Sequence, residues 1–130
     1  MKIAFTQEIP AQRIADLVVS AVEGNHMTRS WCTAFHLKRP GHGDLTDKVW
    51  YADPALYERD DFQILVQEDA NDDGKGDTDH LIGPAELCKG FQLMATKYPA
   101  HFADFISENE DAVTADVFLQ CVALGELVYG

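Results

Sequence analysis

The sequence has few basic residues and no long apolar run, and each shortage excludes a class of protein. Ten Lys and Arg residues stand against 22 Asp and Glu, which gives a formal net charge of −12 at pH 7. Such a surface repels nucleic-acid phosphates and anionic lipid head groups, so we expect no direct nucleic-acid binding and no membrane binding. No stretch approaches the roughly 18 apolar residues of a membrane helix. The segment MKIAFTQEIP lacks the apolar run of a secretory signal, so we expect a cytoplasmic protein.

Cysteine is also scarce, and its positions favour free thiols. The three residues Cys32, Cys88 and Cys121 lie in apolar or periodic segments, which predicts buried, reduced side chains. Cys32 and His36 fall on a predicted strand, where four residues span about 13 Å, too far to share a zinc ion. Because phosphate loops and nucleophile motifs are also absent, we expect no cofactor and no enzymatic activity.

The length and composition predict one α+β domain over residues 1–130. Of the 130 residues 46% are hydrophobic, which is enough for a core without disulfides or a structural metal.

The first half of the chain alternates between strand and helix patterns. Ile3 and Phe5 alternate with polar residues and predict a strand over 2–7. Helical spacing of apolar residues predicts a helix from Pro10 to Gly24. The aromatic-rich segment 31–37 predicts a second strand, and the Pro- and Gly-containing segment 38–48 predicts a loop. A short extended piece over 49–51 and a turn at Pro54 follow.

The second half predicts a hairpin followed by helices. Residues 61–67 alternate as a strand and 79–82 form its partner, with a long acidic connection between them. Helices are predicted from Pro84 to Tyr98, over 100–106, and over a final segment. The apolar positions Leu87, Cys88, Phe91, Met94, Ala95 and Tyr98 mark the first of these, and Val113, Val117, Cys121, Leu124 and Val128 mark the last. This order predicts an antiparallel sheet with helices packed on one face and the C-terminal helices clustered.

The negative charge is concentrated in the second part of the chain. Residues 1–50 have six basic and five acidic residues, whereas 51–130 have four and seventeen. We predict an acidic binding surface between positions 58 and 79, where only Arg59 and Lys75 are basic. Its acidic residues are Glu58, Asp60, Asp61, Glu68, Asp69, Asp72, Asp73, Asp77 and Asp79.

Three further features allow alternative interpretations. The run from Asp69 to Asp77 matches the first half of a calcium loop, but its twelfth position is His80, where a bidentate Glu is needed. A solvated hairpin loop explains the same composition. An aromatic group around the middle loops, with the region after Gly24, could form a groove for a small molecule or a peptide. Its residues are Trp31, Trp50, Tyr51 and Tyr57. His101 is expected to pack between helices.

Several segments together resemble a widespread family of small, uncharacterised proteins of tailed bacteriophages and prophages. They are EIPAQRIADLVVSAVEG at 8–24, WYADPALY at 50–57, GFQLMATKYPAHFADF at 90–105 and DAVTADVFLQCVALGELVYG at 111–130. Many relatives have a second Gly and a Tyr-Trp pair after the early helix, where this sequence has NHMTRSW. The resemblance implies a phage origin and a host bacterial cytoplasm, and it brings no established activity.

Our leading hypothesis is a non-enzymatic phage or prophage accessory protein that binds a host protein through its acidic surface. In one version the acidic residues mimic nucleic acid and occupy a nucleic-acid-binding defence protein. The alternatives are a small-molecule or peptide binder that uses the aromatic group, and a calcium-binding loop protein. Free strand edges also make a homodimer conceivable.

Overall fold

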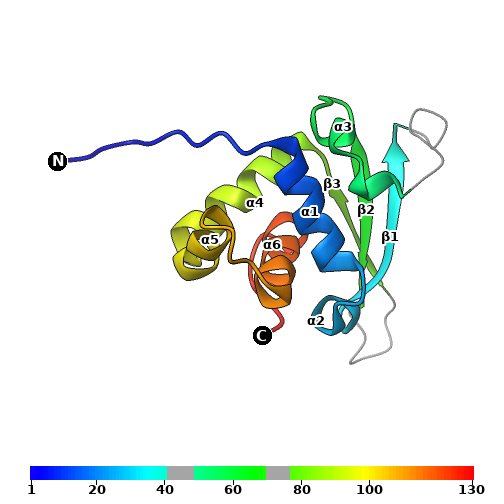
Figure 1. Ribbon diagram of the computed structural model, residues 1–130. Helices are drawn as coiled ribbons and strands as arrows, with labels where there is room; N and C mark the ends of the chain where they lie inside the picture. Colours follow the sequence, from blue (N-terminus) through cyan, green and yellow to red (C-terminus); the bar gives the residue numbers. More distant parts are fainter. Residues whose placement is uncertain (41–48, 70–76) are drawn as a thin grey trace.

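A three-stranded antiparallel sheet with helices on one face forms the framework of the computed structural model (Figure 1). The structure describes residues 1–40, 49–69 and 77–130. The strands lie in the order β1-β2-β3, with bounds Cys32–Arg39, Gln63–Glu68 and Thr78–Ile82. The predicted α+β class, with the C-terminal helices packed together, is confirmed.

The predicted helices occur in the predicted order with small shifts at their ends, and the structure adds the short helix α2, which was not predicted. Pro10 precedes α1, and Gly24, with φ of +67°, follows it in the left-handed conformation that favours glycine. The bounds are α1 Ala11–Val22, α2 His26–Arg29, the 3-10 helix η2 Trp50–Ala52, α3 Pro54–Tyr57, α4 Pro84–Lys97, α5 Pro99–Ile106 and α6 Ala112–Leu124.

The alternation in β2 separates a buried face of the sheet from an open one. Ile64 and Val66 point into the core beneath the helices. Leu65 points the other way, paired with His36 on β1 and Leu81 on β3, and it lies outside the core cluster. Figure 1 shows the longer helices on one side of the sheet only. Leu81 on the open face is 48% exposed.

Helix α6 is the centre of the helical layer. All nine residues from Thr114 to Val122 are buried, so this helix is enclosed by protein on every side. The Asp111 side chain accepts a hydrogen bond from the backbone N–H of Thr114 at 2.9 Å and caps the helix start. Gly125, with φ of +75°, ends it. Val128, which was predicted on the same apolar stripe, therefore lies beyond the helix, and Val113 is exposed.

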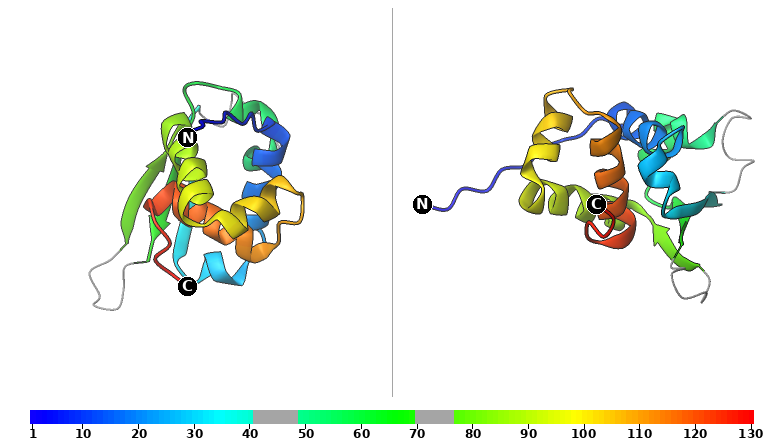
Figure 2. Two further views of the ribbon diagram at one scale, coloured as in Figure 1. Left: turned by 90° about the vertical axis from the view of Figure 1, so that its left-hand side faces the viewer. Right: turned by 90° about the horizontal axis from the view of Figure 1, so that it is seen from below.

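The predicted strand over residues 2–7 is wrong. These residues form an extended arm that projects from the body of the protein (Figures 1 and 2). Ile3 is 62% exposed and Phe5 is 89% exposed. Alternation expresses a preference for extended backbone, but a strand also needs a neighbouring strand to satisfy its N–H and C=O groups.

Three smaller predictions also need correction. Residues 50–52 form a 3-10 turn rather than an extended piece, because the N–H of Ala52 bonds to the carbonyl of Val49. Lys38 and Arg39, predicted in a loop, belong to β1. Cys88 is exposed rather than buried, because the buried face of α4 runs through Leu87, Gly90, Phe91 and Met94, and Cys88 lies beside it.

Gly90 allows α4 and α6 to pack in close contact, and this predicts the effect of a substitution. A Cβ atom at position 90 would lie 2.4 Å from Val122 Cγ2 and 2.7 Å from Val122 Cα. Gly90→Ala should therefore lower the free energy of unfolding by about 1–3 kcal/mol, measured by urea denaturation. In a helix with free space at this position the same change stabilises the fold, so a lower free energy of unfolding would indicate the close contact with Val122. Lys89→Ala on the exposed side is the control, and a stabilised Gly90→Ala would contradict the packing.

Candidate functional site

The predicted acidic surface divides into two groups at opposite ends of β2. Asp72 and Asp73 lie outside the described residues. Of the seven acidic residues that remain, three precede β2, and four lie around the end of β2 and the start of β3. The length of β2, about 17 Å, separates these two groups. The first group is Glu58, Asp60 and Asp61, and the second is Glu68, Asp69, Asp77 and Asp79.

In the first group a neighbouring arginine offsets part of the charge. Arg59 Nε and Nη2 donate to the two carboxylate oxygens of Asp61 at 2.9 and 3.1 Å. These hydrogen bonds lower the pKa of Asp61. Glu58 and Asp60 are exposed.

In the second group two exposed carboxylates are held by neutral donors. Thr33 Oγ1 donates to Asp77 Oδ2 at 2.8 Å, and Gln67 Nε2 donates to Asp79 Oδ1 at 3.0 Å. Asp69 is anchored through its backbone N–H, which donates to the carbonyl of Trp31 at 2.6 Å. Thr33 and Gln67 orient the carboxylates of Asp77 and Asp79 without neutralising them, whereas Asp69 Oδ1 is buried and has no hydrogen-bond partner among the described residues. We call Asp69, Asp77 and Asp79 the acidic sheet end.

Glu68 belongs to an internal cluster instead of this surface. Tyr129 Oη donates to its Oε2 at 2.5 Å, and His80 Nε2 lies 2.8 Å from its Oε1. The hydrogen bond from Tyr129, and after it the bond from His80, lowers the pKa of Glu68 although desolvation opposes the shift. Glu68 thus ties the C-terminal segment to β2.

Asp116, which sequence reasoning missed, is a buried carboxylate on α6. Trp31 Nε1 and Thr28 Oγ1 donate to its Oδ1 at 2.8 and 2.9 Å, and Gln120 Nε2 donates to its Oδ2 at 2.8 Å. The carboxylate therefore connects α6 to α2 and to the start of β1. A usable signal was present, because Asp116 and Gln120 are the polar pair at positions i and i+4 within an otherwise apolar run.

The acidic residues before α6 have structural partners. Arg13 on α1 makes ion pairs with Glu108 at 3.4 Å and with Glu110 at 3.2 Å, and it also donates to the carbonyl of Phe105. Asp111 caps the helix, and the hydrogen bond from the Thr114 backbone lowers the pKa of its carboxyl group. His101 packs between helices as expected, with its Nδ1 3.4 Å from Thr114 Oγ1.

Of the predicted aromatic group, Trp50 and Tyr51 come together beside the end of α1, where Phe35 joins them. Trp31 instead stacks on Tyr129, and Tyr57 packs edge-on against Phe62. Phe35 stacks on Trp50 with 5.3 Å between ring centroids, and Tyr51 packs edge-on against both rings. Tyr51 Oη donates to Glu23 Oε1 at 2.7 Å. Burial, and then the bond to Glu23, raises the pKa of Tyr51 to about 12, so the phenol remains a donor.

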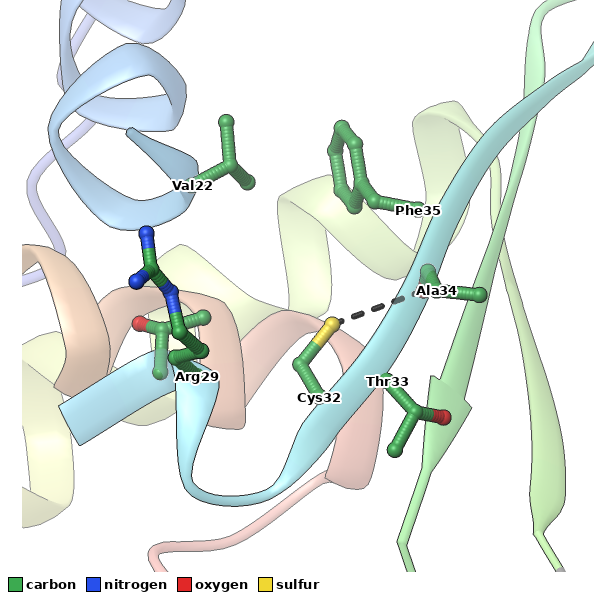
Figure 3. Close-up of a pocket in the computed structure, with 7 residues that line it drawn as sticks. Val22, Arg29, Cys32, Thr33, Ala34 and Phe35 are labelled. Carbon is green, nitrogen blue, oxygen red and sulfur yellow. Dashed lines mark hydrogen bonds between the residues drawn. The ribbon is translucent and has the colours of Figure 1, made fainter. Parts of the chain in front are cut away.

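A small cavity adjoins this aromatic group (Figure 3). Its volume is about 180 Å³, and Val22, Arg29, Cys32 and Phe35 are arranged around it, with Thr28, Thr33 and Ala34 completing the lining. Cys32 Sγ contacts the carbonyl of Ala34 at 3.4 Å, and burial raises the pKa of this thiol to about 11. Within the described part of the chain Arg29 has no ion-pair partner.

The remaining predicted sites have no support as reactive or metal centres. Burial raises the pKa of Cys121 to about 11, which disfavours the thiolate. No group of three His, Cys, Asp or Glu side chains placed to hold a metal occurs within residues 1–40, 49–69 and 77–130. Most of the predicted calcium loop lies in 70–76, outside these ranges.

Comparisons with known proteins do not assign this chain. No family model, no curated protein and no solved structure matches it. Among the helices that the structure describes, none combines the length and apolar character needed to cross a membrane.

The Tyr129–Glu68 contact generates a prediction about acid titration. In Tyr129→Phe the pKa of Glu68 should rise toward its ordinary value, because the variant lacks the hydroxyl whose hydrogen bond lowers this pKa most. NMR of the side-chain carboxyl group measures the pKa. A lowered folded-state pKa stabilises the fold above the unfolded-state pKa, and this stabilisation is lost as the pH falls through the folded-state value. The variant should therefore lose less stability on acidification. Tyr51→Phe, remote from Glu68, is the control, and an unchanged Glu68 titration in Tyr129→Phe would exclude the contact.

Proposed function

We propose that this chain is a non-enzymatic binding protein that presents the acidic sheet end to a basic surface of another protein. The observation that carries the proposal is the pair Asp77 and Asp79, two exposed carboxylates on a regular sheet whose hydrogen-bond donors are the neutral side chains Thr33 and Gln67. The proposal narrows the predicted surface, since the group at the other end of β2 is partly paired with Arg59.

The open face of the sheet supports protein binding over binding of a free ion. Leu81 lies two residues from Asp79 on the same face of β3 and is 48% exposed, whereas Leu65, its partner on β2, is buried. Protein interfaces combine an apolar centre with a polar rim, and charges on the rim govern the association rate and its salt dependence. The partner should therefore carry Lys or Arg around an apolar contact.

The biological setting follows from the family resemblance. A phage or prophage accessory protein would meet host proteins in the bacterial cytoplasm, and nucleic-acid-binding proteins have the basic surfaces that this acidic sheet end complements. In this version the carboxylates take the place of phosphates on the partner.

Capture from bacterial lysate at low and high salt tests the proposal. The protein should retain a partner at low salt and release it at high salt. Asp77→Asn/Asp79→Asn should weaken binding of the purified partner roughly tenfold at low salt, measured by surface plasmon resonance, mainly through slower association. The matched control is Glu58→Gln/Asp60→Asn, which removes two charges at the other end of β2 and should bind normally. Equal binding by both variants would show that the partner does not bind to the acidic sheet end.

The cavity of Figure 3 supports a second candidate, recognition of a small group or a peptide side chain. Its volume is below the 300–1,000 Å³ usual for ligand sites, so it fits one side-chain-sized group. A planar group can stack on the ring of Phe35, and the guanidinium of Arg29 favours a negative charge on that group.

Thermal-shift screening against nucleotides and metabolites tests this second candidate. A specific ligand should raise the melting temperature by mass action in the unmodified protein and in Lys38→Gln, but not in Arg29→Gln. Both substitutions remove one exposed charge and keep a polar side chain. A ligand effect that survives Arg29→Gln would place the ligand elsewhere.

A further inference from the structure

A second and larger cavity lies on the helical side of the molecule. Its volume is about 540 Å³, within the range usual for small-molecule sites. It lies between α2, α5, α6 and the C-terminal segment. Its apolar wall consists of Met27, Val113, Val117, Leu127 and Val128, and its polar lining consists of Ser30, His101, Asp116, Tyr129 and Gly130.

Exposed apolar side chains gather around this cavity. Met27, Val113 and Val128 come from α2, α6 and the C-terminal segment, and they are 37%, 42% and 50% exposed. Single exposed apolar residues are ordinary on protein surfaces, but three from separate elements around one cavity mark a place where an apolar group can be buried.

Asp116 supplies a specific polar group in this lining. The residue is 5% exposed. Trp31 donates an N–H to Oδ1 and Gln120 donates one to Oδ2, and the hydroxyl of Thr28 adds a third hydrogen bond, to Oδ1. A carboxylate has about four acceptor positions, so one position on Oδ2 is left after these three bonds.

The charge of Asp116 has no counterion in the described part of the chain. Its three donors are neutral, and none of the described ion pairs includes it. A buried carboxylate is stabilised strongly by a cation, because water no longer screens the interaction. The net charge of −12 also raises the local concentration of cations.

We propose that this cavity binds a small amphipathic amine. The apolar body lies against Met27, Val113 and Val128, and the ammonium group donates to Asp116. The apolar wall disfavours a hydrated metal ion, and the carboxylate disfavours an anion. The proposal uses residues other than those of the acidic sheet end and does not depend on the proposed protein partner.

Three matched probes test the charge requirement on the full chain. They are phenethylamine, 2-phenylethanol and 3-phenylpropionate, which share an aromatic body and differ in their polar group. Isothermal titration calorimetry should detect saturable binding of the amine, at least tenfold tighter than that of the alcohol and the acid. Ethylamine, which lacks the aromatic body, controls for attraction to the acidic surface and should not saturate.

Variants at the mouth of the cavity test its location without disturbing the core. Val113→Trp and Val128→Trp place bulk on exposed positions and should each weaken amine binding at least tenfold. Leu81→Trp, at an equally exposed position on the sheet, should bind normally. Asp116→Asn should also lose binding once circular dichroism shows that it is folded; if it is not folded, the two mouth variants decide.

Three outcomes would overturn the proposal. They are an affinity for 2-phenylethanol equal to that for phenethylamine, unchanged amine binding in both mouth variants, or no saturable binding of phenethylamine up to millimolar concentration.

Discussion

Asp116 and Gln120 lie one turn apart on the buried helix α6, and their side chains satisfy polar groups from three other parts of the chain. Asp116 accepts hydrogen bonds from Thr28 on α2 and from Trp31, the residue before β1. Gln120 donates to the carbonyl of Tyr129 and accepts from the N–H groups of Val128 and Tyr129, at 2.9 Å each. Because unpaired buried polar groups are costly, these two residues fix where the sheet and the C-terminal segment meet the helix.

This arrangement also decides which negative charges are available to a partner. Gln120 positions Tyr129, and Tyr129 then binds Glu68, so this carboxylate belongs to the interior network. Arg13 forms ion pairs with Glu108 and Glu110, which precede α6. Near the end of β2, Asp77 and Asp79 are exposed, and the neutral side chains of Thr33 and Gln67 hold their carboxylates in place.

Local patterns were reliable where the local preference and the tertiary environment agree. The apolar stripe of α1 predicted both the helix and its buried face, and the alternation of β2 predicted the strand. Leu65, predicted on the other face of β2, is buried as well. The pattern failed for residues 2–7, since an alternating segment becomes a strand only when a sheet edge accepts it. It failed again at Cys88, which borders the apolar stripe of α4 but lies outside the contact with α6. In both cases the missing information is the position of a distant segment.

The sequence by itself determined the α+β class, the order of the helices and the concentration of acidic residues after position 50, because these depend on periodicity and composition. Only the tertiary structure decided that the acidic residues separate into two groups and that Asp116 accepts hydrogen bonds from α2 and from the residue before β1. It alone also decided that Met27, Val113 and Val128 surround one cavity. These are contacts between residues tens of positions apart. Their geometry is set by packing around α6, and no local pattern encodes it.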